Sequence, residues 1–395
     1  MPRFEPFPGL RYDPRFELDR LIAPPYDIVG PELRDVLARR HRANAIHIEC
    51  PLDDRNLSLD RYANAAQLLA AWRAEDVLAA DRRPAFYAYR MTTPEGTVTT
   101  GVIGALGCEP PGGEILPHEE TIPKDTTDRL DLLRACRANL SPIWGLSLTA
   151  GLAGAIAPEG DPDGEATDDE GVLHQVWVLD HPATVEAIST AVGSSPVVIA
   201  DGHHRYQTAC TYQAERLAAG DGPGDQDLVM ALVVELAPDQ LQVGPIHRTI
   251  SGLDPGVDLL EILGRFFETI NAGPAEEKVV AAVAESQALA LVTSEGVWLL
   301  TPRPETYEAA TSELDSSLVA LAVAALPGAT SLHHHAWREA VDAVLSGAAQ
   351  AALLLRPVTV DQISEWAEAR RRMPPKSTYF HPKPRTGMVY RVLGD

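Results

Sequence analysis

The stretch VVIADGHHRYQTA (Val197–Ala209) determines how the centre of the chain is expected to fold. Its β-branched and apolar first residues predict a short buried strand, and the residues from 204 to about 218 have the periodicity of a helix. The motif DGHHR (201–205) stands between the two, where Gly202 lets the backbone turn sharply. The stretch therefore predicts a strand, a tight turn and a helix.

The first turn of that helix has an unusual charge pattern. A helix N-terminus presents unpaired N–H groups and the positive end of the dipole, so potential cations at His203, His204 and Arg205 are unfavourable there. A local conflict of this kind is typical of a functional site. A bound phosphate would resolve it, with Arg205 gripping the anion and the histidines donating hydrogen bonds. Asp201 could then hold a metal ion or accept a proton. The alternative is that Asp201 only caps the helix and the histidines are solvated.

Composition limits the classes of protein to consider. The chain has 395 residues, 45% of them hydrophobic and 23% charged, which fits a soluble globular protein of roughly two to three domains. The net charge of −23 disfavours binding to nucleic acid or to an anionic membrane surface. The four cysteines form no CxxC pair, so neither a zinc knuckle nor a redox dithiol is indicated. With no signal-peptide pattern and no apolar run of about 18 residues, a cytoplasmic protein is expected.

Helices and strands are expected on both sides of the motif. An extended, proline-ordered segment is predicted at 21–29, and an exposed acidic loop or linker at 158–171. Ser58 and Asp180 are expected to cap helices. The predicted helices cover 31–41, 59–80, 129–140, 181–191, 204–218, 313–325, 337–347 and 359–372, and the predicted strands cover 44–50, 84–92, 97–106, 143–148, 174–180, 196–200, 228–237 and 350–358.

The string ADGHHRYQTA resembles the phosphate-binding motif of the ParB/sulfiredoxin-like superfamily. Its members include partition proteins, sulfiredoxins and free-serine kinases, and the serine kinases carry a very similar Asp-Gly-His-His-Arg string. Sulfiredoxins have a reactive cysteine where this chain has His203, which argues against sulfinic-acid reduction. Partition proteins need DNA-binding helices and a basic face, which this sequence does not show.

Nearly the whole chain also resembles the family known as domain of unknown function 1015, a name that implies no activity. The resemblance is carried, in order along the chain, by APPYDIV, HIEC, FYAYR, LPHEETIPK, the DR of TTDRLDLL, ANLSPI, ADGHHRYQTA, GPIHRTI and MPPKSTYFHPKPRTG.

The expected fold class is α+β, a mixed-sheet chain of several parts with a ParB/sulfiredoxin-like core. The expected divisions are an N-terminal α+β domain at 1–157, the acidic linker at 158–171, the core at 172–255, and a C-terminal α/β portion at 256–395 whose basic tail packs back.

Other polar clusters could complete a site. Glu119 could share a magnesium ion with Asp201 or orient a hydroxyl group, or could belong to a solvated acidic loop. Arg248 could be a second phosphate clamp or part of a surface pair. The basic segment around Lys376 is expected to close over the anion site, or to be a strap on an acidic surface. The segment APPYDIV could form a pocket floor or a packed strand.

The candidate residues fall into four groups. The catalytic candidates are Asp201, Glu119 and His204; the phosphate or nucleotide candidates are Gly202, His203, Arg205, Tyr206, Arg129, Arg248 and Lys376; the substrate-pocket candidates are Tyr26, Asp27 and His118; and the magnesium candidates are Asp201 and Glu119.

The expected function is a nucleotide-dependent phosphotransferase that uses Mg²⁺ with ATP or ADP on a small hydroxyl metabolite, such as the free amino acid serine. Phosphoryl transfer depends mostly on positioning and charge stabilisation, which these residue types can supply. Neither a Walker A motif nor a protein-kinase motif set is present. The alternatives are a nucleotide-binding regulator without turnover and a metal-dependent hydrolase that uses the histidines. The sequence does not indicate an oligomeric state.

Overall fold

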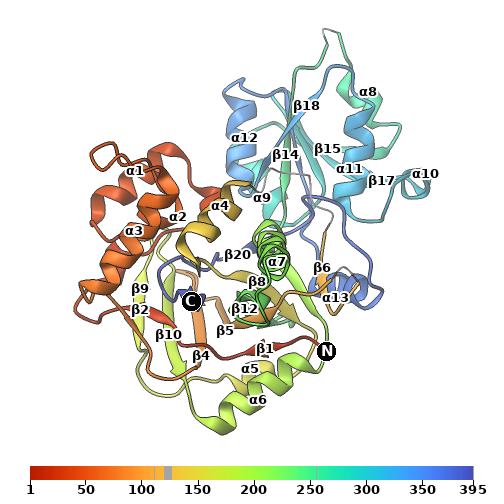
Figure 1. The fold of residues 1–395 in the computed structure, drawn as a ribbon. Helices are drawn as coiled ribbons and strands as arrows, with labels where there is room; N and C mark the ends of the chain where they lie inside the picture. Colours follow the sequence, from red (N-terminus) through yellow and green to blue (C-terminus); the bar gives the residue numbers. More distant parts are fainter. Residues whose placement is uncertain (111, 120–126, 255, 395) are drawn as a thin grey trace. The chain divides into compact units, whose positions relative to one another are not determined.

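The computed structural model describes residues 1–110, 112–119, 127–254 and 256–394 (Figure 1). These residues form two compact units. The first comprises residues 1–118, 127–242 and 382–394, and the second comprises Glu119 and residues 243–381.

The first unit is built on a nine-stranded mixed sheet with the order β6-β11-β8-β12-β5-β4-β10-β9, and β1 pairs with β5. β11 (Val197–Asp201) is parallel to β6 and antiparallel to β8, and β12 (Leu228–Glu235) is parallel to β8 and antiparallel to β5. Residues 228–234 are all buried, so their unbroken apolar run occupies the middle of the sheet.

Helices cover this sheet and enclose its cores. Helix α7 (His203–Ala218) follows β11 after one residue, and Ala209 of α7 joins a core cluster that contains Val197 and Ile199 of β11. α1, α2 and α3 form one group (Figure 1) around a second cluster that contains Trp72. The C-terminal residues 382–394 are part of this unit, and their strand β21 pairs with β7.

The second unit is a six-stranded antiparallel sheet with the order β15-β17-β16-β19-β14-β18. Alternate residues of β19 (Ala351–Leu354) belong to two different core clusters, one with α11 (Asp315–Ala324) and the other with α9 and α12 (Trp337–Leu345). Because side chains alternate between the faces of a strand, α11 and α12 cover opposite faces (Figure 1).

The bounds of the remaining elements are as follows. In the first unit they are β1 (Phe4–Glu5), β2 (Leu10–Tyr12), η1 (Leu18–Arg20), η2 (Tyr26–Ile28), α1 (Pro31–Arg40), α2 (Ile46–Glu49), α3 (Arg61–Ala74), β3 (Leu78–Ala80), β4 (Phe86–Thr92), β5 (Val98–Gly107), β6 (Ile115–Pro117), α4 (Thr127–Cys136), β7 (Ala138–Asn139), β8 (Ile143–Ser147), α5 (Leu152–Ala155), β9 (Gly164–Thr167), β10 (Leu173–Leu179), α6 (Pro182–Gly193), η3 (Asp225–Asp227) and β21 (Arg391–Val392). In the second they are β14 (His247–Ser251), α8 (Leu259–Leu263), β15 (Phe267–Gly273), α9 (Glu277–Glu285), β16 (Ala290–Thr293), β17 (Gly296–Pro302), α10 (Pro304–Ala309), β18 (Thr330–His334), α13 (Val360–Glu368) and β20 (Tyr379–His381), and β13 (Gln242–Gly244) begins at the last residue of the first unit.

The α+β class with a mixed sheet is confirmed. The predicted hairpin is present as the antiparallel pair β4 and β5, and the predicted strand, turn and helix are β11, Gly202 and α7. None of the helices in the described ranges has the length and apolar character needed to cross a bilayer.

Several local predictions are corrected. Residues 44–50 were expected to form a strand but contain the one-turn helix α2, because the side chain of Asn44 accepts a hydrogen bond from the Ile46 N–H and fixes a turn. The cap of α3 is Asp60 rather than Ser58, since Asp60 accepts from the Ala63 N–H. Similarly, α6 begins after His181 rather than after Asp180.

The acidic segment 158–171 is not only an exposed loop. Its residues Gly164–Thr167 form β9 at the edge of the large sheet, and Asp168 is buried. The sheet of the first unit therefore joins strands from both sides of this segment, and the tail 382–394 belongs to the same unit. The two units are defined by pairing between strands that are far apart in the sequence. Local composition does not reveal such pairing.

Candidate functional site

The turn between β11 and α7 has the conformation that the motif predicts. Gly202 has φ 85° and ψ 25°, in the left-handed region that side chains disfavour. A Cβ atom there would also lie 3.0 Å from the Ile143 side chain. The N-terminus of the 16-residue helix α7 therefore starts directly beside the carboxylate of Asp201.

The carboxylate of Asp201 lies between two cations. Its Oδ1 is 2.9 Å from Lys383 Nζ and its Oδ2 is 3.1 Å from Arg205 Nη2. Burial alone would raise the pKa of Asp201, but the charges of Lys383 and Arg205 outweigh it and lower the pKa to about 2. Asp201 is therefore ionised at neutral pH, which suits a cation ligand better than a general base.

The guanidinium of Arg205 makes hydrogen bonds within the protein. Besides Asp201, it donates hydrogen bonds to the Pro142 carbonyl oxygen at 2.5 Å and to Ser141 Oγ at 3.2 Å. These contacts hold Arg205 against the sheet rather than leaving its whole fork for a ligand. Arg205 therefore orients Asp201 as well as adding positive charge beside α7.

A second carboxylate, that of Glu49 at the end of α2, is buried and was not recognised from the sequence. Its side chain is 2% exposed, and it accepts hydrogen bonds from Ser141 Oγ at 3.0 Å and from the Tyr26 N–H. Burial raises the pKa of Glu49 despite the nearby charges of Arg129 and Arg205. The available signal was a charged residue in the otherwise apolar run AIHIEC, where an unpaired charge would be costly.

Arg129 joins the same cluster. Its Nη1 donates to the Glu49 carbonyl oxygen at 2.8 Å, it pairs with Asp128, and its guanidinium lies 4.3 Å from the centre of the Tyr26 ring. Tyr26 therefore contacts this cluster, whereas Asp27 is exposed. Together, Glu49, Ser141, Arg205 and Asp201 form a continuous polar chain from α2 to β11.

A cavity of about 60 Å³ opens beside this chain. Its polar lining residues are Glu49, Arg129, Asn139, Ser141, Arg205 and Thr208, and its apolar lining residues are Leu132, Leu133, Ala138, Leu140, Ala209 and Val229. A site for one water needs only about 10–15 Å³, so the cavity has room for a small polar group or a few waters. It could hold a hydroxyl group next to a buried carboxylate and two cations.

The rings of His118 and His203 lie side by side, with centroids 5.0 Å apart. His118 Nδ1 donates to the Ile199 carbonyl oxygen at 2.7 Å. Burial, followed by the charge of His203, lowers the pKa of His118 to about 3. At neutral pH His118 is therefore uncharged.

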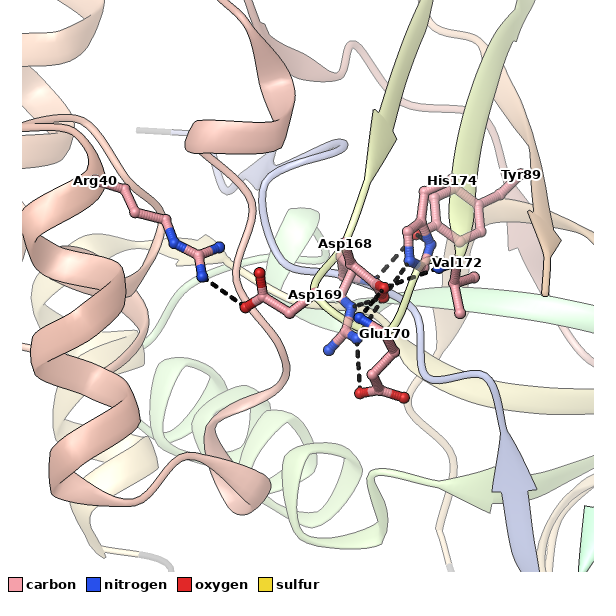
Figure 2. A network of polar contacts seen from close by, with 8 residues as sticks. Arg40, Tyr89, Asp168, Asp169, Glu170, Val172 and His174 are labelled. Atoms are coloured by element: carbon pink, nitrogen blue, oxygen red, sulfur yellow. Dashed lines mark hydrogen bonds and ion pairs between the residues drawn. The ribbon is translucent and has the colours of Figure 1, made fainter. Parts of the chain in front are cut away.

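Figure 2 shows a network of polar contacts around Asp168 and His174. This network anchors the segment that carries Lys383. The Arg385 guanidinium bonds to Asp168, and both side chains are 5% exposed. His174 Nε2 lies 2.8 Å from Asp168, its Nδ1 lies 2.9 Å from the Tyr89 hydroxyl, and that hydroxyl accepts from the Arg385 N–H at 3.1 Å. This closed ring fixes the backbone two residues after Lys383.

Other candidates of the motif have different surroundings. The Tyr206 hydroxyl accepts from the Glu109 N–H at 2.9 Å and its ring packs against the core, so it supports α7. His204 lies in the first turn of α7 and is half-buried.

Three candidates, Glu119, Arg248 and Lys376, belong to the second unit and form a cluster of their own. Arg248 is 7% exposed and donates to the carbonyl oxygens of Ile246 and Lys376. Burial lowers the pKa of Arg248 to about 10, although the charge of Glu119 acts in the opposite direction. Glu119 accepts from the Ser377 N–H at 3.4 Å. The next residues of the LPHEETIPK motif, including Glu120, Thr121 and Lys124, lie outside the described residues.

The described ranges contain no group of three or more His, Cys, Asp or Glu side chains placed to hold a metal ion. A magnesium ion that keeps several waters and binds phosphate oxygens needs only one or two protein carboxylates. Asp201 supplies one ionised carboxylate, whose Oδ1 and Oδ2 also contact Lys383 and Arg205.

Three solved structures resemble parts of this chain at low identity. A conserved hypothetical protein from Pyrococcus furiosus is 13% identical, with a TM-score of 0.37 over 71% of this chain and 92% of that one. A free serine kinase variant in complex with ADP is 12% identical, with a TM-score of 0.38 over 71% and 89%. SbnI with a C-terminal truncation, from Staphylococcus aureus, is 12% identical, with a TM-score of 0.40 over 73% and 86%.

No curated protein matches the sequence. The family model described as protein of unknown function (DUF1015) matches residues 4–317, which is most of the chain. The expected resemblance is thereby confirmed, and the chain belongs to the DUF1015 family.

Proposed function

We propose that the first unit transfers a phosphoryl group from a nucleotide to a small hydroxyl compound, such as the free amino acid serine. The observation that carries the proposal is a half-buried carboxylate, Asp201, joined through Arg205 and Ser141 to a buried one, Glu49, with pKa shifts in opposite directions. When their environments shift the pKa values of two titratable groups in opposite directions, the two groups suit different roles in catalysis.

In the proposed arrangement, the phosphates of the donor lie at the N-terminus of α7. The N–H groups of its first turn and the dipole favour an anion, and Gly202 allows close approach of the backbone. Lys383 and Arg205 add positive charge at the same place. This combination supports phosphate binding more strongly than the helix terminus alone would.

The two carboxylates would divide the remaining work. Asp201 stays ionised and would hold a cation, so its predicted role as base passes to Glu49. The pKa of Glu49 is raised toward the working pH, where a general base is most effective. Glu49 lines the cavity of about 60 Å³, so it could take the proton of a hydroxyl group bound there.

Magnesium is proposed at Asp201 because one carboxylate together with phosphate oxygens and water suits this ion. When bound, the ion would neutralise charge on the phosphates. The chain's own residues would position the donor, exclude water from the cavity and remove the hydroxyl proton.

The test is calorimetric titration of the protein with ATP and with ADP in the presence of magnesium. Lys383→Met should weaken binding about 10- to 100-fold, the range for loss of a charge-assisted contact. Lys278→Met, an exposed residue of α9, is the matched control and should leave binding unchanged. Absence of binding to either nucleotide, or equal binding by both variants, would refute the proposed donor site. Binding without turnover would favour the regulator.

A further inference from the structure

The second unit contains a separate cavity of about 190 Å³. It lies below the roughly 300–1,000 Å³ of sites that take drug-sized ligands, so it suits a single ring system. Its lining includes three ring side chains, His247, His335 and Trp337, over an apolar floor that includes Leu354 and Leu355. Among the described side chains that line it, none is Asp, Glu, Lys or Arg. The part of a ligand that enters the cavity is therefore uncharged.

His247 offers a defined hydrogen-bond donor to this cavity. The residue is 6% exposed, and its Nδ1 accepts from the Leu355 N–H at 3.1 Å. Because Nδ1 is an acceptor, the ring proton is on Nε2, which has no hydrogen-bond partner among the described residues. Burial, followed by the charge of Arg248, lowers the pKa of His247 to about 4, so the ring is neutral at physiological pH.

The ring side chains of His335 and Trp337 are held in place by their neighbours. The His335 ring stacks on Tyr379 with centroids 3.8 Å apart and an interplanar angle of 15°. Trp337 packs against the core cluster of α9 and α12, and the Arg338 guanidinium lies 4.4 Å from its ring centre. Fixed aromatic surfaces over a small apolar space favour a flat ligand.

Gln287 adds a donor and an acceptor to the same lining. It follows α9 with φ 51°, and its side chain is exposed. A glutamine amide can make paired hydrogen bonds to the edge of adenine, whose neighbouring groups are a donor and an acceptor.

We propose that this cavity of the second unit binds a purine base of the adenine type. The base would stack on the rings of His335 and Trp337, accept a hydrogen bond from His247 Nε2–H and form hydrogen bonds with the Gln287 amide. This site does not depend on the proposed phosphotransfer, since it needs no phosphate and uses no residue of the motif 201–205.

The probe is adenosine, which has no phosphate, titrated into the full-length protein by calorimetry. Gln287→Gly removes the amide at a position whose φ suits glycine, and His247→Asn keeps an acceptor for the Leu355 N–H while removing the Nε2 donor. Each change should weaken adenosine binding about 10- to 100-fold, as expected for loss of a specific base contact. Arg370→Gly, another exposed position with φ 51° after a helix, is the matched control and should bind as the unchanged protein does.

One further result decides the ligand class. Indole, which is flat but lacks the paired donor and acceptor edge, should bind at least about 10-fold more weakly than adenosine. The proposal is overturned if adenosine does not bind, if Gln287→Gly and His247→Asn bind it normally, or if indole binds equally well.

Discussion

The buried ion pair of Asp168 and Arg385 can be tested with a close control, because the next residue, Asp169, forms an exposed ion pair (Figure 2). Asp168→Asn removes the charge that faces Arg385, and both side chains are 5% exposed. Removal of one partner of a buried ion pair leaves an uncompensated charge, which costs about 3–5 kcal/mol. Glu170, which also contacts Arg385, is itself 53% exposed and compensates only in part. Asp169→Asn breaks an ion pair with Arg40 in which Asp169 is 58% exposed, and should cost at most about 1 kcal/mol.

The assay is urea unfolding of the two variants and the unchanged protein, followed by circular dichroism and tryptophan fluorescence. Burial alone would raise the pKa of Asp168, but the hydrogen bond from His174 and the charge of Arg385 lower it. A group with a depressed folded pKa stabilises the protein above its unfolded pKa of about 4 and loses this contribution as the pH falls through the folded value. The difference between the two variants should therefore be full at pH 7 and shrink in acid. Equal unfolding free energies for the two variants at pH 7 would refute the reasoning.

Three other predictions test the first unit. Glu49→Gln should lower the rate of ADP release in a coupled assay by at least about 100-fold, the range for loss of a general base, with nucleotide affinity retained; equal rates would contradict the proposed base. Because burial raises the pKa of Glu49, its contribution to stability declines as the pH rises through that pKa, so Glu49→Gln should be at least as stable as the unchanged protein at pH 8 in urea unfolding. Gly202→Ala should lower the free energy of unfolding by about 1–2 kcal/mol because of its φ of 85°, and by more because its Cβ would contact Ile143. Gly220→Ala, with φ 94° and open space around it, should lose only the conformational part. Equal losses of unfolding free energy would show that the contact with Ile143 is unimportant.

Local chemistry was enough to predict the centre of the fold. The change from strand to helix periodicity at Gly202 and the charges of the DGHHR motif are properties of consecutive residues, and the structure has β11, the turn and α7 where they indicate. The hairpin of β4 and β5 could be predicted for the same reason.

The missed features depend on residues far apart in the sequence. Asp168 looks like an ordinary surface acid in the sequence, and only the apolar neighbours of Glu49 hint that it is buried. Their contacts with arginines far away in the sequence are tertiary features. Asp168 lies in an acidic run that predicts a loop, yet its partner is 217 residues away. Likewise, no local pattern assigns Glu119 to the second unit, since that assignment follows from tertiary contacts.

The central proposal is transfer of a phosphoryl group to a hydroxyl group, and phosphorus NMR of the reaction mixture tests it most directly. Protein, ATP and magnesium would be incubated with serine, then with other small hydroxyl compounds. The account predicts a new phosphomonoester signal equal in amount to the ADP formed, absent with Asp201→Asn and with Glu49→Gln. A mixture that contains only ATP, or only ADP and inorganic phosphate with every hydroxyl compound, would contradict it.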